Sequence, residues 1–60
     1  MNPNQNVIRA ARNLIEEHGK AAESIALARA KSARESNRGD VANTWRDIAA
    51  EVRRIQRLTK

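Results

Sequence analysis

The sequence predicts a small all-α protein, and three observations lead to that prediction. Alanine, arginine and glutamate, which favour helices, are abundant, while the chain holds one tryptophan and no tyrosine or phenylalanine. Apolar residues recur at steps of three and four, the period of an amphipathic helix, and nowhere alternate as in a strand. Two glycines divide the 60 residues into three such stretches. The predicted fold is a three-helix bundle with its helices at about 3–18, 20–36 and 40–58.

The first predicted helix, residues 3–18, has a signal at each end. Asn2 suits the capping position, and Pro3 suits the first helical position, where its missing N–H is not needed. Gly19 can take the left-handed conformation that ends many helices. We expect residues 1–5 to be flexible. The apolar face of this helix consists of Val7, Ile8, Ala11, Leu14 and Ile15.

The second predicted helix, residues 20–36, is rich in alanine on all sides. Its two large apolar residues, Ile25 and Leu27, lie on nearly opposite faces, which suits a middle position with a neighbour on each side. We expect this helix to end at Asn37-Arg38-Gly39.

The third predicted helix, residues 40–58, carries the clearest apolar stripe in the chain. Asp40 is expected to cap it. The only aromatic residue, Trp45, lies on the stripe and is predicted to be the largest piece of the core. We call this stripe the packing seam, and its members are Val41, Trp45, Ile48, Val52 and Ile55.

An alternative architecture follows if Gly19 does not break the first helix, because one glycine inside a helix costs only about 1 kcal/mol. The chain would then be a long helix folded back on a shorter one, a hairpin that needs a partner to cover it. Continuity would leave Leu27 among Arg9, Lys20 and Lys31 on the solvent side. We therefore favour the break.

Length and composition predict one domain, residues 1–60, with a thin core. A core of this size rarely supplies more than about 3–5 kcal/mol, and no cysteine is present to add a disulfide. Self-association is the remaining way to stabilise the chain, so a dimer is expected. The lack of cysteine fits a reducing compartment, and no apolar run is long enough for a membrane span. We expect a cytoplasmic protein.

Few residues suit catalysis or metal binding. His18 is the only histidine, and the adjacent Glu16 and Glu17 diverge around a helix instead of converging on one ion. No glycine-rich phosphate loop is present, and so small a chain has little volume for a pocket. We therefore predict that the chain has no catalytic residues, binds no cofactor or metal, and has no enzymatic activity.

Positive charge is the chain's other feature. Twelve basic residues against seven acidic ones give a net charge of +5 and a pI near 11.2, which favours polyanions. One basic cluster lies toward the end of the second predicted helix and another at the end of the third. In antiparallel helices these two clusters would lie at opposite ends and form no single stripe. The candidate polyanion contacts are Arg29, Lys31, Arg34, Arg38, Arg53, Arg54 and Arg57.

Several short motifs together resemble a group of small, uncharacterised bacterial helical proteins. Such chains read A-R-x-L-I-x-x-H-G, then spaced alanines, then G-D and a tryptophan-bearing helix. Similar chains often have an acidic residue after the His-Gly pair, where this one has Lys20. The resemblance implies an all-helical fold and no catalytic residues or ligand. It rests on Ala11-Arg12, Leu14-Ile15, His18-Gly19, Ala22, Ala26, Arg29-Ala30, Gly39-Asp40, Trp45, Ile48 and Val52.

The sequence thus predicts a non-enzymatic interaction module that self-associates or docks on a protein partner. The alternative is an accessory nucleic-acid-binding protein that acts through phosphate contacts. A membrane partner is not expected, because helix packing uses the bulky apolar residues.

Overall fold

The computed structural model describes residues 5–58, and every regular element among them is helical, which confirms the all-α prediction. The predicted cap at Asn2-Pro3 and the first four residues of the predicted flexible tail lie outside the described residues. Gln5, the fifth, is already helical. The elements are the helix α1 (Gln5–His18), the short 3₁₀ turn η1 (Gly19–Ala21), the helix α2 (Ala22–Glu35) and the helix α3 (Gly39–Leu58).

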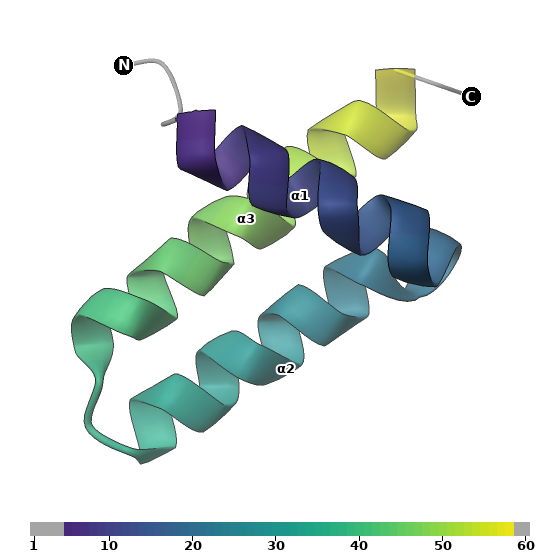
Figure 1. Ribbon diagram of the computed structural model, residues 1–60. Helices are drawn as coiled ribbons and strands as arrows, with labels where there is room; N and C mark the ends of the chain where they lie inside the picture. Colours follow the sequence, from purple (N-terminus) through teal and green to yellow (C-terminus); the bar gives the residue numbers. More distant parts are fainter. Residues whose placement is uncertain (1–4, 59–60) are drawn as a thin grey trace.

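Residues 5–35 form one joined helical segment, because η1 leads directly from α1 into α2 (Figure 1). The helix α3 packs against this segment, mainly antiparallel to α2, so the chain is a hairpin of a long and a shorter arm. This architecture matches the alternative prediction. The long arm bends at η1, and as a result α1 lies across α3 (Figure 1).

The bend depends on Gly19, whose φ of +56° lies in the left-handed region that glycine adopts without strain. The carbonyl oxygen of Gly19 accepts a hydrogen bond from Nε2 of Gln56 on α3, at 2.8 Å. Gly19 thus takes the left-handed conformation predicted for it, yet the next residues are helical again. The hydrogen bond fixes the bend against the C-terminal half of α3.

A pair of glycine substitutions tests the bend. We expect Gly19→Ala to lower the free energy of unfolding by about 1 kcal/mol, because a side chain disfavours positive φ. Gly39→Ala is the matched control. Gly39 has no positive φ, and a methyl group on its Cα would meet open space, so alanine there should stabilise α3 by about 0.4–1 kcal/mol. Chemical denaturation measures the free energy of unfolding of both variants. If the two substitutions change it equally and in the same direction, Gly19 does not need its left-handed conformation and the bend is contradicted.

The turn between α2 and α3 lies where the sequence predicts the second helix to end, but the residue in the left-handed position there is not the glycine. Asn37, and not Gly39, has the left-handed backbone, with φ +60°. The N–H of Arg38 donates to the carbonyl of Ala33 at 2.8 Å, and that of Asn37 to Arg34 at 3.0 Å. These two bonds form a Schellman motif, in which asparagine replaces the more usual glycine.

Helix α3 begins one residue earlier than predicted, at Gly39. The carbonyl of Arg38 accepts the first hydrogen bond, from the N–H of Ala42 at 2.9 Å. Asp40 is therefore inside the first turn and does not cap the helix. Its carboxylate there still favours the positive end of the helix dipole.

A single core joins the three helices, and more than half of the buried apolar residues are alanines. Alanine lets the backbones of α2 and α3 approach closely, but it buries little area per residue. Leu27 is 48% exposed, the solvent position that the sequence predicts for an unbroken arm. The core cluster consists of Val7, Ala11, Leu14, Ala22, Ala26, Ile48, Ala49 and Val52.

Candidate functional site

The predicted packing seam is buried in its C-terminal part and open in its N-terminal part. Ile48 and Val52 are buried, while Trp45 and Ile55 are partly buried and pack against the core. Val41 is 37% exposed and lies outside the core cluster, so its assignment to the core is corrected. The reason is the position of α1, which crosses the other half of α3 and leaves the end of the hairpin uncovered (Figure 1).

Trp45 contacts a residue that the sequence predicted to bind polyanions. The guanidinium carbon of Arg29, on α2, lies 5.0 Å from the centre of the indole ring. A cation at this distance over an aromatic face gives a favourable cation–π interaction. Arg29 therefore belongs to the packing of the α2–α3 pair and is less available to a ligand than the other candidates.

Residues 5–58 contain one ion pair, which joins Arg54 to Glu51. Nε of Arg54 donates to Oε1 of Glu51 at 3.0 Å, and a second guanidinium nitrogen donates to the same oxygen. The hydrogen bond and the carboxylate charge raise the pKa of Arg54 above its ordinary value. Glu51 is only 5% exposed, so Arg54 neutralises a buried carboxylate and is partly committed to that role.

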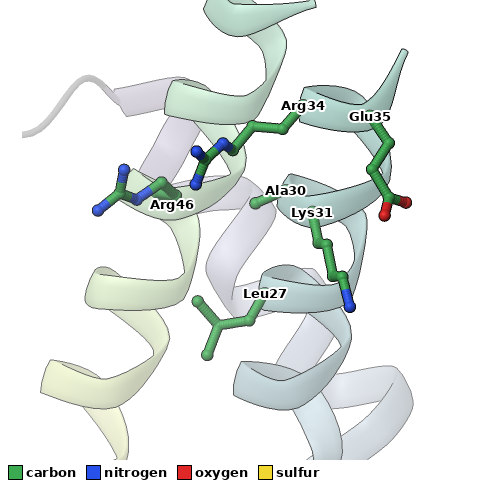
Figure 2. A pocket seen from close by; sticks show the side chains of 6 residues that line it. All are labelled: Leu27, Ala30, Lys31, Arg34, Glu35 and Arg46. Carbon is green, nitrogen blue, oxygen red and sulfur yellow. The ribbon is translucent and has the colours of Figure 1, made fainter. Parts of the chain in front are cut away.

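A surface groove lies between α2 and α3, and we call it the α2–α3 groove (Figure 2). Leu27 and Arg34 reach from α2 toward α3, whereas Lys31 and Glu35 lie on the outer side of α2 (Figure 2). Arg46 of α3, which the sequence reasoning missed, completes the set. Three cations and one carboxylate thus surround an exposed leucine, and the residues that line the groove are Leu27, Ala30, Lys31, Arg34, Glu35 and Arg46.

A second depression lies toward the C-terminal end of α3 and is also basic. It is lined by Ala50, Arg53, Arg54, Arg57 and Leu58, and Leu58 is 71% exposed. Arg46, Ala50, Arg53 and Arg57 follow one another at steps of four, three and four residues, so they share one face of α3.

The two basic clusters line separate depressions, as expected for antiparallel helices, and Arg46 shares one face of α3 with Arg53 and Arg57. We call Arg46, Arg53 and Arg57 the arginine stripe. All three are exposed. Arg38, the remaining predicted contact, is exposed in the turn before α3 and lines neither depression.

The residues considered for catalysis do not come together. His18 is exposed in the last turn of α1, where a basic residue suits the negative end of the dipole. Among residues 5–58, no group of three histidine, cysteine or acidic side chains is placed to hold a metal ion. Within the same part of the chain, no helix combines the length and the apolar character needed to cross a membrane.

No family model, curated protein or solved structure matches this chain. The resemblance to small bacterial helical proteins therefore stays a prediction. The chain's own surface is the basis for inferring its function.

Proposed function

We propose that this chain is a small, non-enzymatic interaction module that self-associates through the open end of its hairpin. The observation that carries the proposal is the exposure of Val41 beside the partly buried Trp45, where α1 does not reach. A valine and an indole on a surface without a covering helix gain free energy when a second apolar surface excludes water from them.

The thin core gives a second reason. Its alanines contribute little apolar area, and a 60-residue domain without disulfides has few other sources of stability. A dimer in which the same face of each copy meets the other would extend the core by covering Val41 and the part of Trp45 that the chain itself leaves unburied. Such an isologous contact is the commonest way in which small proteins associate.

Light scattering coupled to size-exclusion chromatography, from about 1 μM to about 1 mM protein, tests the proposal. We expect the mass to rise from monomer to dimer across this range. Val41→Lys should move the midpoint at least about tenfold higher in concentration, because a lysine there would bring two like charges into the contact. Ala28→Lys, an exposed site on α2, adds the same charge and should leave the midpoint unchanged.

Two results would count against self-association. A chain that stays monomeric and fully folded over the whole range has no need of a second copy. Equal effects of Val41→Lys and Ala28→Lys would show that added charge, and not the face containing Val41, controls association. A monomer that binds another protein through Val41 would keep the interaction module but replace the second copy by a different partner.

A further inference from the structure

We propose that the arginine stripe, together with Lys31 and Arg34 of the α2–α3 groove, binds the phosphate backbone of a nucleic-acid duplex. The surface uses residues of α2 and α3 other than Val41 and Trp45, so the proposal does not depend on self-association. Its starting point is that Arg46 lines the groove and lies on the same face of α3 as Arg53 and Arg57, which line the second depression.

The charges of α3 are separated around its axis. The arginine stripe has steps of seven and four residues, and so do the acidic residues Asp40, Asp47 and Glu51. The two sets are offset by six positions, and each residue turns the helix by about 100°, so they lie about 120° apart. One side of the exposed face of α3 is therefore basic, while the acidic residues lie on another side.

The positive charges of this surface are not neutralised by the chain itself. In residues 5–58 the ion pair uses Arg54, and it leaves the arginine stripe, Lys31 and Arg34 without a carboxylate within salt-bridge distance. Glu35 lines the outer side of the groove, and Glu23 precedes Leu27 by one turn on α2, so the basic surface has an acidic border. Unpaired cations gain most from a polyanion, because binding releases its condensed counterions.

The dimensions of the stripe suit a duplex. Arg46 and Arg57 are eleven residues apart, or about 16 Å along the helix axis. Because each strand winds around the duplex axis, the phosphates within reach come from both strands, which together carry about nine over that length of axis. Five cations, three on α3 and two on α2, can therefore each approach a phosphate, with no requirement for contacts to the bases.

A single strand fits this surface less well, because strand binding relies on aromatic side chains that stack with bases. The chain's one aromatic residue is Trp45, which packs on the core and is covered by Arg29. An acidic protein is the competing partner, since Leu27 offers an apolar contact inside the basic groove. The alignment of Arg46, Arg53 and Arg57 along one face of α3 favours a partner whose charges are also arranged in a line.

Fluorescence anisotropy with a labelled DNA duplex of about two helical turns tests the proposal at about 50 mM and about 200 mM salt. Five phosphate contacts predict that affinity falls roughly 500-fold between these conditions. The variant Arg46→Gln/Arg53→Gln/Arg57→Gln keeps two contacts, so its affinity at the lower salt should be weaker than that of the unaltered chain. Its affinity should then fall by only roughly tenfold between the lower and the higher salt. Glutamine favours helices and the sites are exposed, so circular dichroism should show an unchanged fold.

The matched control is Arg9→Gln/Arg12→Gln/Lys20→Gln, which removes the same charge from exposed positions on α1 and η1. It should retain the roughly 500-fold salt effect of the unaltered chain. If both triple variants lose the same affinity for the duplex, the proposal is overturned, because the chain's net positive charge and not the arginine stripe would then attract the duplex. Absence of binding at the lower salt would also overturn it. If poly-glutamate competes as well as unlabelled duplex at equal charge, the partner of the surface is an acidic protein.

Discussion

Trp45→Ala is expected to lower the free energy of unfolding by about 3 kcal/mol, the low end of the range for a large aromatic residue. Trp45 is only partly buried, so the loss is smaller than for an enclosed indole. The substitution also removes the ring that Arg29 covers. A domain of this size has a total stability of similar magnitude, so the variant should be largely unfolded at 25 °C.

Urea denaturation followed by circular dichroism measures this effect. Leu58→Ala is the control, because Leu58 is on the same helix but mostly exposed, and its loss should stay within about 0.5 kcal/mol. An unfolding midpoint for Trp45→Ala that equals that of Leu58→Ala would show that the indole does not contribute to the core.

Ala26→Leu is expected to destabilise the chain by about 1–3 kcal/mol, although leucine favours helices almost as strongly as alanine. Ala26 is completely buried in the core cluster, with no room for a larger side chain unless the helices move apart. Ala28→Leu places the same side chain on an exposed part of α2 and should change the stability by less than about 0.5 kcal/mol. Thermal unfolding distinguishes the two.

A tolerated leucine at Ala26 would mean that α2 and α3 are separated widely enough to leave space between them. A loss of stability with Ala28→Leu as large as that with Ala26→Leu would point to a contact on the exposed side of α2.

Much of the fold was predictable, because local residue patterns determine it. The apolar period placed Ile48 and Val52 in the core. Gly19 was recognised as the boundary, but the favoured helix break there was wrong, because the chain continues through η1 into α2. Which residue takes the second left-handed position was not predictable, since Asn37 and Gly39 both suit one. Spacing alone also placed Val41 in the core. Its exposure depends on where α1 ends across α3, which is a tertiary relation.

The candidate surface was only half predictable. The clusters at either end of it stand out as runs of basic residues, so Lys31, Arg34, Arg53 and Arg57 were found. Arg46 is isolated in the sequence and adjacent to Asp47, which gave no sign of a cluster. Its position in the groove emerges only when α2 is placed beside α3. The cover that Arg29 gives to Trp45 depends on the same pairing.

The alanine-lined contact between α2 and α3 has a further thermodynamic consequence. A leucine or methionine loses rotamer freedom when it becomes buried, whereas alanine has none to lose. Each alanine in the contact therefore contributes its modest transfer free energy almost without an opposing side-chain entropy term. A short chain with few large apolar residues can in this way bring two helices together at low entropic cost.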